Sequence, residues 1–202
     1  MTIRPLAALL AVTVAAAWPA APAAAQTLGT PVFLAPYRAF ERVEYGVTFS
    51  DPGAGSAVEG HYRFASGSAD FGLRAGIRDQ RFGDTQFLVG VDWRQQTLRH
   101  NADFPLDGSL TLGVGLSTGD GHTAVLAPVG FSMGRRILIE DSEVQLTPYL
   151  HPVAALSMNG DTDLVFGLGF GVDVKVSRRF EVRVAGAMGD YDGVSVGVSF
   201  LR

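Results

Sequence analysis

Two pairs of side chains in this sequence have the types and spacing that could support acid–base chemistry. Glu59 precedes His61 by two residues, and Tyr149 precedes His151 by two residues. Each pair would share one face of an extended strand, where an acid–His pair can act as a general base and its orienter. The other histidines have no recognisable nucleophile spacing around them, and His-x-Ser does not occur. We therefore expect His61 and His151 to belong to a structural polar network, and we predict no catalytic residue and no enzyme activity.

Composition excludes several other kinds of site. The chain has no cysteine, and its His, Asp and Glu residues show no convincing metal-ligand spacing, so we predict no metal and no cofactor. The acidic stretches 161–163 and 190–192 are better explained as turns than as calcium sites. With 16 basic and 20 acidic residues, no basic face and no recognisable motif, the chain is not expected to bind nucleic acid.

The elements that must position the polar residues show a period of two from residue 41 onward. Apolar side chains occupy alternate positions, and Gly-, Asp- and Ser-rich turns separate the alternating segments, as in hairpin-connected strands. The candidate strands cover residues 43–49, 58–65, 71–78, 87–94, 110–116, 123–135, 143–158, 164–176, 180–188 and 194–200. An even count of ten places both ends of the sheet on one side, although eight or twelve strands are also compatible with the pattern.

Two features of these segments predict local irregularity. Pro128, Pro148 and Pro152 fall within candidate strands, and each lacks the N–H that a ladder hydrogen bond requires. Residues 97–108 form a longer connection than the other turns. We expect bulges or gaps in the ladder at the prolines. The connection is expected on the periplasmic side if the N-terminus is periplasmic.

The first 25 residues have the features of a secretory signal peptide. Arg4 supplies a positive charge, Leu6 to Trp18 is apolar, and Ala23-Ala24-Ala25 provides a cleavage site. The apolar run is about 13 residues, whereas a spanning helix needs roughly 20. We predict a cleaved signal over 1–25, a lead-in over 26–40 and a barrel domain over 41–202.

The composition of the polar face predicts which side of the barrel it occupies. Its charges are nearly balanced in sign, arginine greatly outnumbers lysine, and glycines lie between them. A narrow lumen explains this pattern, because glycine leaves space and the guanidinium pairs bidentately with carboxylates. The alternative is a set of solvated surface charges. The predicted lumen charge network comprises Arg42, Glu44, Glu59, His61, Arg63, Arg74, Arg78, Asp92, Arg94, His151, Asp173, Lys175, Glu181 and Arg183.

The last strand adds a resemblance to a known family. Val194, Val196, Val198 and Phe200 alternate with Ser and Gly, and Leu201-Arg202 follow. With the leader and the alternating strands, this end resembles the small bacterial outer-membrane β-barrel superfamily of OmpA-type, OmpX-type and opacity-protein barrels. The resemblance covers residues 41–202. It implies that these four residues form an assembly signal, that the protein lies in the outer membrane among its lipids, and that barrel-assembly machinery and periplasmic chaperones act during biogenesis.

Together these features predict an all-β, antiparallel up-and-down transmembrane barrel of about ten strands. A barrel of about eight strands is just filled by its side chains and open channels need roughly 16, so the lumen should be mostly occluded. A structural or envelope-binding role follows. One alternative is a narrow pore for ions or small solutes. Another is a soluble periplasmic or secreted lipocalin-like carrier, in which Phe71, Leu112, Phe166 and Phe170 would line a pocket. The sequence does not predict an oligomeric state.

Overall fold

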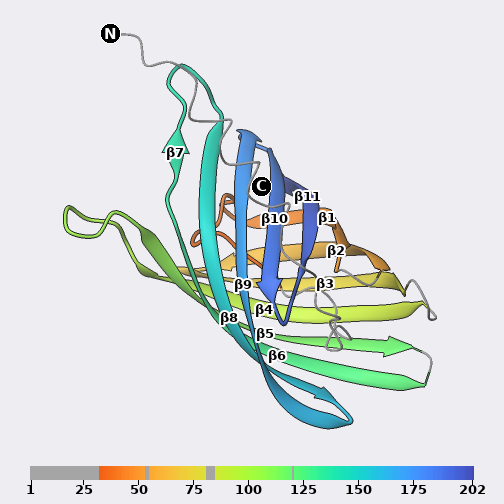
Figure 1. Ribbon diagram of the computed structural model, residues 1–202. Helices are drawn as coiled ribbons and strands as arrows, with labels where there is room; N and C mark the ends of the chain where they lie inside the picture. The colour runs from red at the N-terminus through yellow and green to blue at the C-terminus, as the bar shows by residue number, and fades with distance from the viewer. Residues whose placement is uncertain (1–31, 53–54, 81–84, 120) are drawn as a thin grey trace, which may run out of the picture.

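The computed structural model describes residues 32–52, 55–80, 85–119 and 121–202, which form a closed antiparallel β-barrel (Figure 1). Ten strands close the ring in the order β6-β5-β4-β3-β2-β1-β11-β10-β9-β8, and β8 pairs with β6. The strands are β1 (Val43–Asp51), β2 (Gly55–Ser66), β3 (Ala69–Gln80), β4 (Gln86–Leu98), β5 (Asp107–Gly119), β6 (His122–Gly134), β8 (Gln145–Asn159), β9 (Asp161–Ser177), β10 (Phe180–Gly189) and β11 (Gly193–Leu201). A two-residue strand, β7 (Ile137–Leu138), pairs with the start of β8. The predicted fold class and the count of ten wall strands are confirmed.

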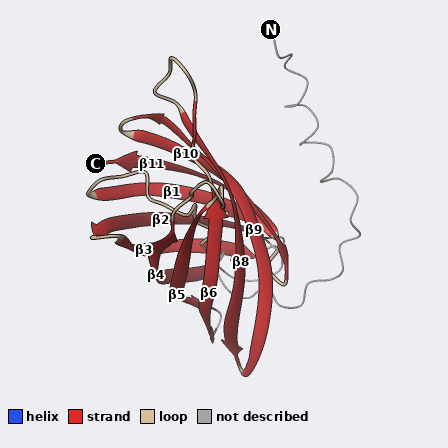
Figure 2. Ribbon diagram, turned by 90° about the vertical axis from the view of Figure 1, so that its left-hand side faces the viewer, coloured by secondary structure: helices blue, strands red, loops and turns tan. Residues whose placement is uncertain are grey.

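The first and last wall strands close the barrel and bring its two ends together. β1 pairs with β11 from Glu44↔Leu201 to Asp51↔Val194. Next to this ladder, the Arg42 N–H donates to the Arg202 carbonyl at 2.7 Å. Sequential hairpins form the rest of the wall, as Figure 2 shows. We call the end where β1 begins and β11 finishes the terminal end, and the other the hairpin end.

The longer connections are at the terminal end. Residues 99–106 join β4 to β5, and residues 135–144, which include β7, join β6 to β8. The first of these is the long connection predicted from the sequence, and it lies at the same end as the two chain ends of the wall. Figure 1 shows both connections projecting beyond the wall. The turns at the hairpin end are shorter, so the terminal end offers more loop surface.

Two of the three strand prolines coincide with gaps in a ladder. The β5–β6 register passes from Leu112↔Val129 to Gly115↔Leu126, which leaves Pro128 out of that ladder. The β6–β8 register passes from Gly130↔Val153 to Met133↔Leu150, which leaves Pro152 unpaired with β6. The third proline, in β8, stays within a continuous β8–β9 register. The predicted irregularity is therefore present at two positions.

The apolar face of the strands points outward. The outer surface carries large apolar side chains from every wall strand, with exposures of about 36–64 %. The four residues that a carrier would need in a pocket are among them: Phe71, Leu112, Phe166 and Phe170. The pocket lining expected for the lipocalin-like alternative is therefore wrong, because these side chains point outward from β3, β5 and β9 and do not face the lumen.

The residues of the predicted assembly signal also lie on this outer face. They alternate with inward-facing residues along β11, and Phe200 is packed between two other aromatic rings. Its ring stacks on Tyr45 of β1 at 5.7 Å and meets Phe180 of β10 edge-on at 5.5 Å. Such aromatic pairs join neighbouring strands, so Phe200 connects the closing strand to both sides of the seam.

The inward face is polar along most of the barrel but apolar near the hairpin end. There, small and medium apolar side chains pack together inside the wall. This cluster consists of Ala124, Leu126, Ala155, Val165 and Tyr191. The sequence positions of the first four fall on the predicted inward face, but their apolar character was not part of the prediction. No helix among the described residues is long and apolar enough to cross a membrane.

Candidate functional site: the barrel lumen

The most highly charged part of the lumen is built around Arg183 of β10. Its Nη1 and Nη2 atoms donate to the two carboxylate oxygens of Glu44 on β1, at 2.6 and 2.7 Å. Its Nε donates to Glu181 at 2.8 Å, and Asp173 of β9 lies 3.6 Å away. Glu44 is fully buried. This bidentate geometry is the arrangement expected when a guanidinium must neutralise carboxylates without solvent.

A serine, a histidine and a glutamate meet in this region, but not with the geometry of a catalytic triad. His61 Nε2 lies 3.0 Å from the Ser199 hydroxyl and 3.2 Å from the Glu44 carboxylate. In a triad, the two ring nitrogens serve different partners: one faces the nucleophile and the other faces the acid. Here one nitrogen faces both, and Ser199 is fully buried. The arrangement is that of a buried hydrogen-bond network. His61 is therefore paired with Glu44 and not with its sequence neighbour Glu59.

A second ion network joins β2, β3 and β4. Arg63 contacts both Asp70 and Asp92, and Arg94 Nε donates to the other oxygen of Asp70 at 2.9 Å. Asp70 was missing from the network predicted from the sequence. Its position next to the 66–68 turn hid it, although it has the same parity as Arg74 along β3. Strand parity extended back by one residue from the predicted strand start at residue 71 would have found it.

The remaining predicted members have different surroundings. Arg74 pairs with Glu59 at 3.4 Å. Arg78 is fully buried, and its three guanidinium nitrogens have no hydrogen-bond partner within the described part of the chain. Lys175 bonds to a backbone carbonyl. Arg42 is a correction to the prediction. The first strand begins at Val43, so Arg42 precedes it, and its exposed side chain lies outside the buried network.

Residues 32–40, part of the predicted lead-in, lie inside the barrel. The Leu34 N–H donates to His151 Nδ1 at 3.2 Å, and the Leu34 carbonyl accepts a hydrogen bond from Ser132. His151 Nε2 lies 2.8 Å from the Thr111 hydroxyl. Because Nδ1 accepts, we assign the proton to Nε2, which makes His151 a neutral hydrogen-bonding residue. His151 therefore positions the N-terminal segment, and no acid among the described residues forms an ion pair with it.

Other wall side chains bind the backbone of the same segment. The Tyr149 hydroxyl donates to the Phe33 carbonyl at 3.3 Å, Arg94 donates to the Ala35 carbonyl at 2.7 Å, and Lys175 donates to the Ala39 carbonyl at 2.9 Å. The Phe33 ring lies over the position where Gly169 would carry a Cβ. A backbone without a sheet partner must satisfy its polar groups in another way, and here the wall satisfies them.

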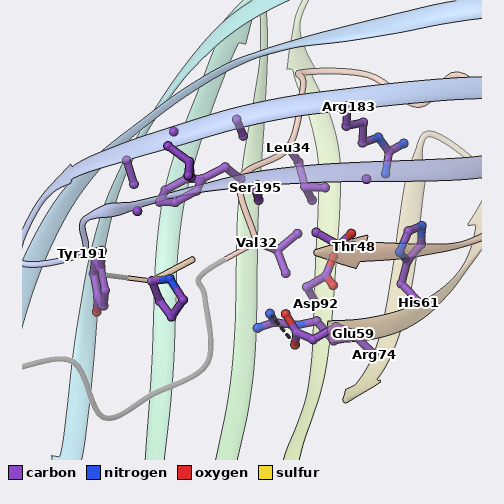
Figure 3. Close-up of a pocket in the computed structure, with 18 of the residues that line it drawn as sticks. Val32, Leu34, Thr48, Glu59, His61, Arg74, Asp92, Arg183, Tyr191 and Ser195 are labelled. Atoms are coloured by element: carbon purple, nitrogen blue, oxygen red, sulfur yellow. Dashed lines mark hydrogen bonds and ion pairs between the residues drawn. The ribbon is translucent and has the colours of Figure 1, made fainter. Parts of the chain in front are cut away.

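Between this segment and the wall, a cavity of about 110 Å³ remains. Figure 3 shows its lining, with Val32 and Leu34 facing charged wall residues that include Arg74 and Arg183. Since a buried water needs roughly 10–15 Å³ on this scale, the cavity has room for several waters. Drug-sized ligands occupy about 300–1,000 Å³, so it is too small for one.

Tyr191 lies beside this cavity in the turn between β10 and β11. Its hydroxyl is buried and has no hydrogen-bond partner in the described portion of the chain. Burial raises the pKa of this hydroxyl, and the neighbouring Asp190 carboxylate raises it further. Tyr191 is therefore a neutral side chain that fills space. Among the described residues, no group of three or more His, Asp or Glu side chains is placed to hold a metal ion.

Comparison with known proteins adds no family to this description. No family model matches the chain, and no curated protein matches it. The functional proposals below therefore depend on the barrel itself: its outer surface, its ion networks and the segment bound inside it. The signal peptide predicted for residues 1–25 lies outside the described residues.

Proposed function

We propose that this chain is a small barrel of the bacterial outer membrane, exported through a cleaved signal peptide, with a mostly occluded lumen and a structural or envelope-binding role. The observation that carries the proposal is the distribution of polarity across the wall. Large apolar side chains cover the outside, while paired arginines and carboxylates are buried inside. Water would favour the reverse distribution, and a hydrocarbon surrounding favours this one.

The bound N-terminal segment supports the occluded lumen. Residues 33–39 lie in the lumen beside the ion networks, and five wall side chains hold their backbone. The space left over admits only waters or small ions. Passage of larger solutes through this part of the lumen therefore finds no room. We propose a non-enzymatic role for the protein.

Fractionation tests the location. The full-length chain is expressed in a Gram-negative host, and its membranes are separated, extracted with detergent and run on SDS gels with and without boiling. We expect recovery in the outer membrane, migration that changes on heating, and an N-terminus at Gln26. Recovery of a folded protein in the soluble periplasmic fraction would contradict the proposal. Depletion of the host's barrel-assembly machinery should reduce the folded form.

A narrow pore is the second candidate function. It is favoured by one observation: hydrogen bonds from side chains hold the N-terminal segment, and it forms no sheet ladder with the wall. Planar-bilayer recordings compare the mature chain with a refolded variant that begins at residue 39. A pore predicts higher conductance for the shortened barrel, with an ion selectivity that changes when Arg74 is replaced by Gln. Equal, negligible conductance of both forms would leave the structural role alone.

A further inference from the structure

A large cleft opens at the terminal end of the barrel. Its volume is about 870 Å³, and its walls come from the 67–68 turn, the 99–106 connection and the beginning of the 135–144 connection. The N-terminal segment contributes residues 36–38. The arginines that line the cleft are Arg38, Arg94, Arg99, Arg135 and Arg136. The cleft is separate from the cavity inside the barrel and is not used by the function proposed above.

The two acids that line the cleft already have partners. Asp70 is shared between Arg63 and Arg94. Asp107 accepts a hydrogen bond from the His100 backbone N–H at 3.1 Å and lies 3.0 Å from the imidazole Nδ1 of the same residue. Five arginines therefore face two aspartates across the cleft. The balance leaves a net positive charge in a concave site, where the walls concentrate the field on a bound anion.

Neutral groups hold three of the arginines in place. Arg38 donates to the carbonyls of Ala69 and Gly67 at 2.8 and 2.9 Å, and Arg135 donates to the carbonyl of Pro105 at 2.9 Å. Carbonyl acceptors fix a guanidinium without cancelling its charge. These contacts use one or two donors of each fork, and five N–H donors are available on each side chain.

The third of these guanidiniums is held by an aromatic ring. The Arg136 guanidinium carbon lies 4.3 Å from the centre of the Tyr37 ring, and its Nη2 donates to the Arg38 carbonyl at 3.5 Å; these contacts orient the cation and use one nitrogen of its fork. Arg99 and Arg136 are both exposed. The cleft thus presents fixed, partly solvated guanidinium groups along its mouth.

Exposed apolar side chains flank the arginines. Leu138 lines the cleft and is 67 % exposed, and its neighbours Ile137 and Ile139 are also exposed. A cationic cleft beside an apolar strip suits an amphiphile with an anionic head. Guanidinium forks match the geometry of phosphate oxygens especially well. We propose that this cleft binds a phosphate group, free or carried by a lipid head group, whose oxygens contact Arg99, Arg135 and Arg136.

Calorimetry tests the proposal with the mature barrel folded in a maltoside detergent and a phosphate-free buffer. The two titrants are inorganic phosphate and dihexanoyl phosphatidic acid. The test variant is the double substitution Arg135→Gln/Arg136→Gln. The matched control, Arg178→Gln/Arg179→Gln, removes the same charge from the 178–179 turn at the same end but outside the cleft.

We expect the test variant to weaken binding at least about tenfold and the control by less than about twofold, since only the test variant loses charge-assisted hydrogen bonds to the phosphate. Binding of inorganic phosphate would identify a site for the free anion, and binding of phosphatidic acid alone would identify a lipid head group; both support the proposal. Absence of binding, or equal weakening by test and control, overturns it. Arg99→Gln serves as a second variant if the double one does not fold.

Discussion

Replacing Glu44 by Gln should destabilise the barrel strongly, whereas replacing the nearby Asp173 by Asn should not. Both carboxylates surround the same guanidinium, but their geometry differs. Glu44 receives two hydrogen bonds from Arg183, at 2.6 and 2.7 Å. Asp173 approaches that guanidinium only to 3.6 Å, and its other oxygen has no hydrogen-bond partner within the described residues. Both variants remove one negative charge near Arg183, but only Glu44→Gln removes a bidentate partner. A difference in stability between them therefore reports the contribution of the pairing geometry.

The magnitude follows from burial and distance. Two unit charges about 4 Å apart attract by roughly 4 kcal/mol at an effective dielectric of 20. Removing one partner of a buried pair costs about 3–5 kcal/mol. Since Arg183 keeps Glu181 as a partner, we expect about 3 kcal/mol for Glu44→Gln. Asp173→Asn loses little attraction and relieves repulsion from two carboxylates, so we expect a change within about 1 kcal/mol of zero.

Urea unfolding of the mature barrel in lipid vesicles measures these values through the fluorescence of Trp93, the single tryptophan after residue 25. Glu143→Gln provides an exposed control, because its partner Arg178 lies 3.4 Å away with a largely exposed side chain. That control should change stability by less than about 1 kcal/mol. The reasoning is refuted if Asp173→Asn costs as much as Glu44→Gln, or if Glu44→Gln matches the exposed control.

Three further substitutions test the outer face, the bound segment and the second ion network. Phe170→Arg on the outer face should cost roughly 2–4 kcal/mol in lipid and impair assembly, whereas Phe170→Leu should assemble normally. Gly169→Ala should displace the Phe33 ring and make residues 32–40 sensitive to protease in the folded barrel. Gly115→Ala, whose Cβ meets only ordinary contacts, should leave them protected. Asp70→Asn removes the carboxylate shared by two buried arginines and should cost about 3–5 kcal/mol by the urea assay, with a value below 1 kcal/mol arguing against a shared ion pair.

The sequence was most informative where side chains alternate. A period of two determines which residues share a face, and the closed sheet then brings Glu44 of β1 next to Arg183 of β10 although 139 residues separate them. The partner of each charge was not predictable, because pairing depends on strand register. Thus His61 contacts Glu44 of the neighbouring strand instead of Glu59. The bounds of the strands are harder to predict than their alternation, which explains both the omission of Asp70 and the inclusion of Arg42.

The bound N-terminal segment could not be predicted from any pattern. Residues 32–40 have no alternation and no helical period, so their conformation is set by the wall that surrounds them. Ser132 and His151, which hold Leu34, and Thr111, which contacts His151, fall on the polar face and resemble any other small or polar lining residue. Only the closed barrel shows that they act together on the backbone of Leu34. His151, which contacts Thr111, binds the Leu34 N–H, and Ser132 binds the Leu34 carbonyl.

This use of His151 constrains any transport role. Its Nδ1 is occupied by the Leu34 N–H and its Nε2 by Thr111, so the imidazole is saturated with hydrogen bonds while the segment is bound. Withdrawal of the segment would expose one acceptor on His151 and one hydroxyl donor on Ser132 to the lumen. Buried polar groups without partners are costly, and water must replace the lost bonds. Opening a path through this barrel therefore requires hydration of the lumen at the same step, and a dry, partly vacated lumen is disfavoured.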